Sequence, residues 1–326
     1  MRRTLALLAA AACLLRATPA RGEPNDVNLF FLGPPSPGVW QALYPSITSS
    51  EATQYASDSL QRFALLSTQV GLGLSSMLLT PANTVGHSGF EFGFDFAYVP
   101  VTSPSIGSVP TPVAGDPSFQ TGIWPVRGAS PTAALLPAFH VRKALPFSFE
   151  IGGRAIYLTE STMVATQIEL KWAISEGFRY VPDVALRGAA THLFGSPQFD
   201  LSTAEADLIV GKRFGVGGVM SLTPYGAVRM TWLSAKSESV DFRLASTPPP
   251  ATPAAQFDTV AAFPQLDAHF LRFTLGLRMM LGALTLSAEG TYFAGQTISG
   301  SSTPGSYPTF EVPSSVVGAA NLGFSF

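Results

Sequence analysis

Residues 89–100, with the sequence GFEFGFDFAYVP, alternate between aromatic side chains and small or acidic ones. The aromatic side chains share one parity: Phe90, Phe92, Phe94, Phe96 and Tyr98. Because side chains alternate faces along a β-strand, this segment has one aromatic face and one acidic face. The aromatic face is stable either in a protein core or against lipid.

The same period of two recurs along the chain and predicts ten strands. Most of these segments are about 11 residues or longer, which is about twice the length of strands in ordinary globular proteins, whereas a tilted membrane-spanning strand needs about 9 to 11 residues. We therefore expect an all-β fold, a closed antiparallel transmembrane β-barrel without open edges. A soluble exported β-sandwich is the alternative, and it would have to cover the aromatic face with a second sheet. The predicted spans are 88–100, 132–143, 146–160, 162–176, 182–194, 198–214, 216–236, 266–281, 283–296 and 312–326.

Composition agrees with a membrane setting, since 46% of the residues are hydrophobic and only 12% are charged. The formal net charge of −2 offers no basic patch, so nucleic acid is not expected as a partner. At the N-terminus, Arg2 and Arg3 precede an apolar run over 5–15 and small residues at 18–20, which is the layout of a secretory signal peptide. We assign residues 1–22 to it, with cleavage after Ala20 or Gly22. Cys13 lies within it, so the exported chain has no cysteine.

The chain ends in NLGFSF, with Leu322, Phe324 and Phe326 on one parity. Together with the signal peptide and the alternating segments, this ending resembles that of bacterial outer-membrane β-barrel proteins, and the resemblance covers residues 88–326. It implies insertion into the cell outer membrane, outer-membrane lipids as surroundings, and recognition of Phe326 by the barrel-assembly machinery. It does not predict an oligomeric state.

Connection lengths and aromatic positions give two further indications of a barrel. The connections 101–131, 237–265 and 297–311 are long and fall at one end, while those after Lys143, Phe214 and Leu281 are short and fall at the other. Each rising strand carries an outward aromatic near its upper end, as in the girdles of membrane barrels. These girdle residues are Tyr98, Tyr157, Phe194, Trp232 and Tyr292.

The opposite parity predicts a charged lumen. The candidates are Glu91, Asp95, Arg142, Glu150, Arg154, Glu169, Lys171, Arg187, Glu205, Asp207, Arg213, Arg229, Arg272, Arg278 and Glu289. Acids and bases are nearly balanced, which is typical of paired charges that fill an interior, whereas a selective pore favours rings of one sign. On one strand, for example, Arg272 is expected to face the lumen, where Glu289 can pair with it, and Leu275 to face hydrocarbon.

Residues 23–87 are a separate N-terminal segment that precedes the barrel at 88–326. Thr48 and Glu51 have capping-box spacing and predict a helix over about 49–68. This segment could plug the lumen, lie at the inner membrane surface, or pack across the barrel mouth.

Two functions remain open from the sequence. The first is a narrow channel or transporter for small or hydrophobic molecules; long-chain fatty-acid transporters also have a segment before the barrel, but their Asn-Pro-Ala motif is missing here. The alternative is a structural or adhesive barrel whose extracellular loops bind partners. No catalytic motif surrounds the histidines, of which His192 is a weak rim candidate, so an enzyme, a cofactor and a metal are not expected.

Overall fold

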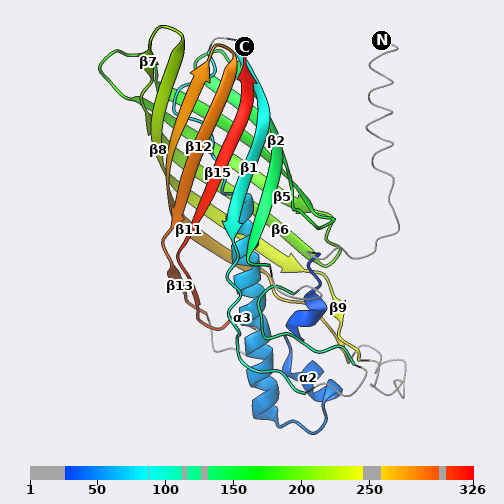
Figure 1. The fold of residues 1–326 in the computed structure, drawn as a ribbon. Coiled ribbons are helices and arrows are strands. Elements are labelled where there is room, and N and C mark those ends of the chain that lie inside the picture. The colour runs from blue at the N-terminus through cyan, green and yellow to red at the C-terminus, as the bar shows by residue number, and fades with distance from the viewer. Residues whose placement is uncertain (1–25, 87, 112–115, 126–130, 245–257, 301–305) are drawn as a thin grey trace, which may run out of the picture.

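Ten antiparallel strands close into a barrel in the computed structural model, which describes residues 26–86, 88–111, 116–125, 131–244, 258–300 and 306–326 (Figure 1). The predicted fold class is confirmed, and all ten alternating segments are barrel strands. The predicted signal peptide lies outside the described residues. In their order around the barrel, the strands are β1 (Phe90–Pro100), β2 (Ala133–Leu145), β3 (Phe149–Tyr157), β4 (Val164–Ser175), β5 (Asp183–Phe194), β6 (Phe199–Gly211), β8 (Met220–Ser237), β11 (Leu266–Leu281), β12 (Leu284–Phe293) and β15 (Ser315–Ser325), which pairs with β1.

The barrel wall is apolar outside and charged inside. Leu275 and Ile168 on the outer face are 75% and 69% exposed, whereas Asp95 and Arg229 on the inner face are 0% exposed. The aromatic face of β1 lies on the outside, and no second sheet among the described residues covers it, so the soluble sandwich is wrong. Apolar side chains on the outer face are stable where the surrounding medium is hydrocarbon. Closure of the barrel meets a second requirement of that medium, because it pairs the backbone N–H and C=O groups of every strand.

The two ends of the barrel differ in their connections. At one end, called here the turn end, the C-terminus lies beside short connections, namely 146–148, 176–182, 212–219 and 282–283. The connection 212–219 includes β7 (Phe214–Val216), which pairs with β8. The opposite end, the loop end, carries the long connections, in which β9 (Val240–Asp241) pairs with β10 (Val260–Ala261) and β13 (Gln296–Ile298) with β14 (Phe310–Val312).

In the described part of the chain, three helices precede the barrel and lie at its loop end (Figure 1). They are the 3-10 helix η1 (Leu29–Leu32), α2 (Pro37–Leu43) and α3 (Ser49–Leu74). The capping box forms as predicted at the start of α3, with the Glu51 N–H donating to Thr48 Oγ1 and the Thr48 N–H donating to Glu51. The helix extends past the predicted end at 68, and its last turns enter the barrel. None of the helices in the described part of the chain combines the length and apolar character needed to cross a bilayer.

Gly71 allows the end of α3 to enter the narrow interior. A Cβ at this position would lie 2.1 Å from Leu233 Cδ1 on the inner face of β8. An α-helix with side chains is about 10–12 Å across, and the inner face of the barrel carries side chains of its own. Glycine therefore suits this contact, and a larger residue would require the Leu233 side chain to move.

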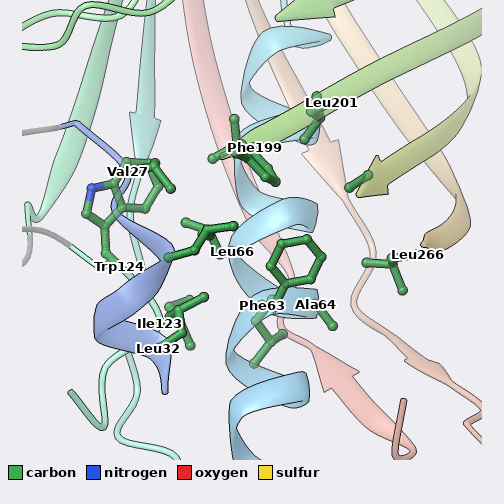
Figure 2. Close-up of a cluster of buried hydrophobic side chains, with 14 of the residues drawn as sticks. Val27, Leu32, Phe63, Ala64, Leu66, Ile123, Trp124, Phe199, Leu201 and Leu266 are labelled. Atoms are coloured by element: carbon green, nitrogen blue, oxygen red, sulfur yellow. The ribbon is translucent and has the colours of Figure 1, made fainter. Parts of the chain in front are cut away.

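The helices and the long connections form a folded unit, which we call the cap: residues 26–74 with the described parts of the connections that pack on them. Phe63 of α3 stacks on Phe263 with ring centroids 4.5 Å apart, and Trp40 of α2 meets Phe119 edge-on at 4.9 Å. Figure 2 shows Phe63 and Leu66 beside Phe199 of β6, so the cap core continues into the mouth of the barrel.

Arg62 holds three parts of the cap together from a fully buried position. Its guanidinium donates to the carbonyl of Leu32 in η1 at 3.1 Å, to the carbonyl of Ile106 in the first long connection at 2.8 Å, and to Ser59 Oγ at 3.1 Å. Burial lowers the pKa of Arg62 to about 10, against the opposing effect of Asp58. The side chain stays charged at neutral pH, so its hydrogen bonds to the two carbonyls are charge-assisted and stronger than neutral ones.

Candidate functional site: the lumen and the segment within it

Residues 75–86, called here the lumen segment, run from the end of α3 through the barrel to the start of β1. Ser75 to Thr84 are buried. Leu78 and Ala82 pack against apolar side chains of the wall, including Ile209 and Tyr225. The N-terminal segment therefore both packs across the mouth and fills the lumen, which joins two of the three predicted placements.

Basic side chains of the wall donate hydrogen bonds to main-chain carbonyls of the lumen segment. Arg229 Nη2 and Nη1 each lie 2.9 Å from the carbonyl oxygens of Ser75 and Ser76, respectively. Arg154 Nη1 lies 2.8 Å from the carbonyl of Met77. The next carbonyls are held by Arg142, which donates to residues 78 and 79 at 3.1 and 3.3 Å, and by Lys171, which donates to residues 81 and 83 at 3.3 and 3.2 Å.

Arg272 completes this series at the end of α3. Its Nη1 donates to the carbonyl of Ser75 at 2.8 Å, within the last turn, where helix carbonyls have no partner of their own. A cation at this end also interacts favourably with the helix dipole. The predicted pairing of Arg272 with Glu289 is wrong: Glu289 lies opposite Gly276, closer to the turn end, and is occupied by other donors.

Acidic side chains accept the main-chain N–H groups of the same segment. Glu289 Oε1 and Oε2 each lie 2.7 Å from the N–H nitrogens of residues 78 and 79, and Oε2 also accepts from Tyr225 at 2.8 Å. Closer to the turn end, Glu176 accepts from the Thr84 N–H at 2.8 Å and Glu150 from the Val85 N–H at 3.0 Å. The hydrogen bonds from the wall to the lumen segment are therefore made mainly to main-chain groups of that segment.

The charged side chains also pair with one another. Glu205 and Asp207 of β6 share two guanidinium groups, those of Arg187 and Arg229. Arg187 Nη2 also pairs with Glu169 at 2.7 Å, and Arg142 Nε with Glu169 at 2.6 Å. Buried charges are costly unless each has both an opposite charge and further hydrogen bonds. For Arg229 and Arg142, carbonyls of the lumen segment supply these further hydrogen bonds.

A second group of buried charges surrounds Asp95 of β1. Arg154 Nε lies 2.8 Å from its carboxylate, His140 Nδ1 2.9 Å, and the amide of Asn321 on β15 also donates to it at 2.8 Å. Sequence reasoning missed His140 as a lumen residue, although it shares the inward parity of Arg142 on the same strand. Glu91 lies in the same region, paired with Arg142 at 3.0 Å and with Arg278.

The structure places fourteen of the fifteen predicted lumen residues in buried positions on the inner face. Arg213 is the exception and the prediction for it is wrong. The strand β6 ends at Gly211, so the alternation no longer holds at Arg213, which is exposed at the rim of the turn end.

The predicted outer residues lie on the outer face. All five girdle aromatics are exposed there. Leu322 and Phe324 are exposed on β15, beside β1, and Phe326 is exposed just after the end of β15. The Phe326 N–H donates to the carbonyl of Phe90 at 2.8 Å, so the last residue takes part in closing the barrel. Among the described residues, no group of three or more His, Asp or Glu side chains is placed to hold a metal ion.

No family model matches the chain, and no curated protein matches it. Solved structures that match include the outer membrane protein OprG from Pseudomonas aeruginosa, at 16% identity over 76% of this chain and 99% of that chain, with a TM-score of 0.32. The attachment invasion locus protein Ail of Yersinia pestis matches at 11% identity over 73% and 97%, with a TM-score of 0.24. The translocator domain of autotransporter NalP from Neisseria meningitidis matches at 9% identity over 83% and 98%, with a TM-score of 0.32. Such low similarity carries no functional argument, and the closed strand order with its inverted polarity identifies an outer-membrane type of β-barrel.

Proposed function

We propose that the protein is an outer-membrane barrel closed by its own N-terminal segment, and that it displays the cap at the cell surface as a module for binding partners. The observation that carries this proposal is the lumen segment, whose main chain is held by charged wall residues along the barrel interior. Among the two functions left open by the sequence, this corresponds to the structural or adhesive barrel.

The direction of the cap follows from the two ends of the barrel. In bacterial outer-membrane barrels the short turns lie on the periplasmic side and the long loops on the extracellular side. The cap lies at the loop end together with the three long connections. The chain therefore enters the lumen from the extracellular side with the last turns of α3 and reaches the periplasmic side before β1.

The packing of the cap supports its role as a module rather than a loose plug. It has an aromatic core, and Arg62 bonds to main-chain carbonyls of both the N-terminal segment and the first long connection. The tip formed by the connection between α2 and α3 and the start of α3, residues 45–51, carries mostly polar, exposed side chains. A solvated tip on a fixed core suits contact with a hydrophilic partner.

A narrow channel or transporter is less well supported. An ion path needs a continuous aqueous lumen lined by groups that can exchange ligands, whereas these wall charges are engaged with each other and with the lumen segment. Opening such a path would require the lumen segment to leave and would expose the buried charges.

The topology can be tested with single cysteines, because Cys13 is the only cysteine and lies in the predicted signal peptide. Ser46→Cys, on the exposed tip of the cap, should react with a membrane-impermeant maleimide in intact cells. Val219→Cys, in the exposed turn before β8, is the matched control and should react only after the outer membrane is permeabilised. The reverse pattern would exclude display of the cap outside the cell.

Conductance tests the closed lumen separately. Full-length protein in planar bilayers should give no steady open current. A steady current from the intact protein would favour the channel instead, whatever the cysteine labelling shows.

A further inference from the structure

The outer wall of the barrel is hollowed over β5 and β6. Two successive outward cross-strand pairs lack side chains beyond Cβ: Ala190 lies opposite Ala204, and Gly188 lies opposite Ala206. We call this hollow the outer furrow. Larger outward side chains flank it on both neighbouring strands, namely Ile168 and Leu170 on β4 and Met230 and Trp232 on β8. The furrow contains two hollows, of about 680 Å³ over the first pair and about 720 Å³ over the second.

Polar side chains close the furrow toward the loop end. His192, Ser202, Ser234 and Asp267 lie next to one another on β5, β6, β8 and β11, and all four line the first hollow. We call these four residues the polar row. His192 Nδ1 lies 2.8 Å from Ser202 Oγ. The girdle residue Trp232 is the next outward residue below Ser234 on β8, so the polar row lies at the edge of the apolar band.

We propose that the outer furrow binds one zwitterionic aminophospholipid, with an acyl chain over the alanine and glycine pairs and the head group at the polar row. The occupant follows from the position of the furrow, because this wall faces lipid. Both hollows are open depressions rather than enclosed pockets, which suits a chain lying along the wall. The furrow also changes from apolar to polar along its length, as a lipid does.

The head group follows from the charges of the polar row. Asp267 is exposed, and its carboxylate, which accepts from the Gln265 side-chain amide at 3.0 and 3.1 Å, has further lone pairs for an ammonium group. The hydroxyls of Ser202 and Ser234 and the ring of His192 can donate to phosphate oxygens. Lys236 lies near the polar row, and its Nζ forms an ion pair with Asp200 Oδ2 at 3.4 Å. An anionic lipid without an amine would leave Asp267 facing a like charge.

Binding fits this site better than hydrolysis, although His192 and Ser202 are in contact. A hydrolase needs free N–H donors directed at the oxyanion, and Ser202 lies inside a strand that is paired on both sides. The sequence candidate His192 is therefore assigned to binding a head group rather than to catalysis.

A second place on the same wall supplies a control. On β12 and β15, Ala288 lies opposite Ala320, and Gly290 lies opposite Gly318. The next outward residues toward the loop end are the apolar Tyr292 and Val316, so this place has small residues without a polar row.

The test uses full-length protein refolded in vesicles of phosphatidylethanolamine and phosphatidylglycerol in equal amounts, then extracted in mild detergent for native mass spectrometry. Wild type should retain one phosphatidylethanolamine. Ala204→Phe fills the furrow and should lower retention by about tenfold or more, while Ala320→Phe should leave it within about twofold. Asp267→Asn should keep the retained lipid but remove the preference for the ethanolamine head group.

Each variant is first checked for heat-modifiable migration, which shows that the barrel has closed. Equal loss of lipid in the two Phe variants would overturn the site, since it would reflect the general lipid layer around the barrel. Preferential retention of phosphatidylglycerol, or an unchanged preference in Asp267→Asn, would overturn the assignment of the head group.

Discussion

Replacement of Arg229 by Met tests whether the lumen segment and the charge network stabilise each other. Met keeps the length and the apolar stem of the side chain but removes the guanidinium. The variant loses two hydrogen bonds to the carbonyls of residues 75 and 76 and the ion pairs to Glu205 at 2.7 Å and Asp207 at 3.2 Å. All of these contacts are buried, with Arg229 at 0% exposure.

The expected loss of unfolding free energy is about 3–5 kcal/mol, the usual cost of removing one partner from a buried ion pair. Arg187 contacts the same two carboxylates, so neither is left without a cation. We therefore expect the lower part of that range. Since whole proteins are stable by about 5–15 kcal/mol, this loss is a large fraction of the total.

Arg213→Met is the matched control. Parity in the sequence assigned both arginines to the lumen, but Arg213 is exposed at the rim, where a substitution changes stability by about 0.5 kcal/mol or less. The measurement is the unfolding of each full-length variant by urea in lipid vesicles, monitored through tryptophan fluorescence. Equal losses in the two variants, or a loss below about 1 kcal/mol for Arg229→Met, would refute the buried network.

Three further predictions concern the wall of the barrel and its seam. Leu275→Arg, at a position 75% exposed on the lipid side of β11, should lower the unfolding free energy in vesicles by about 2–4 kcal/mol, and Leu275→Ala should lower it much less. Because Arg272 binds the end of α3, Arg272→Leu should cost at least as much as Leu275→Arg; a much smaller loss would show that this contact is dispensable. Deletion of Phe326, which bonds to Phe90 at the seam of the barrel, should reduce membrane insertion far more than Ser325→Ala, and similar insertion yields for the two would argue against a terminal assembly signal.

The strands could be predicted from the sequence because their periodicity is imposed by the two media on either side of the wall. Parity also identified most lumen charges, and it could have identified His140, which alternates in phase with Arg142. It failed at Arg213, because alternation holds only as far as the strand, and β6 ends two residues earlier. A strand end set by a hairpin leaves little trace in a local pattern.

The end of α3 and the path of the lumen segment could not be predicted in the same way. The helix continues to Leu74 because Gly71 fits against Leu233 and because Arg229 and Arg272 bind the carbonyl of Ser75, contacts between residues more than 150 positions apart. The lumen segment has no periodicity, and its main chain rather than its side chains makes most of the polar contacts. A pattern of side chains therefore carries little information about its place.

The balance of charge in the lumen follows from what occupies it. Residues 75–86 carry no charged side chain, but each peptide unit offers a carbonyl that a cation can hold and, except at proline, an N–H that an anion can hold. A wall of one sign could satisfy only half of these groups and would leave the other half buried without a partner. Without Arg213, the predicted set contains seven acids and seven Lys or Arg residues, all buried. Glu176 and the buried Asp183 add two acids near the turn end, so both signs are present in similar numbers. A lumen built around a neutral main chain requires both signs, and the same balance that argues against a selective pore fits a barrel closed by its own chain.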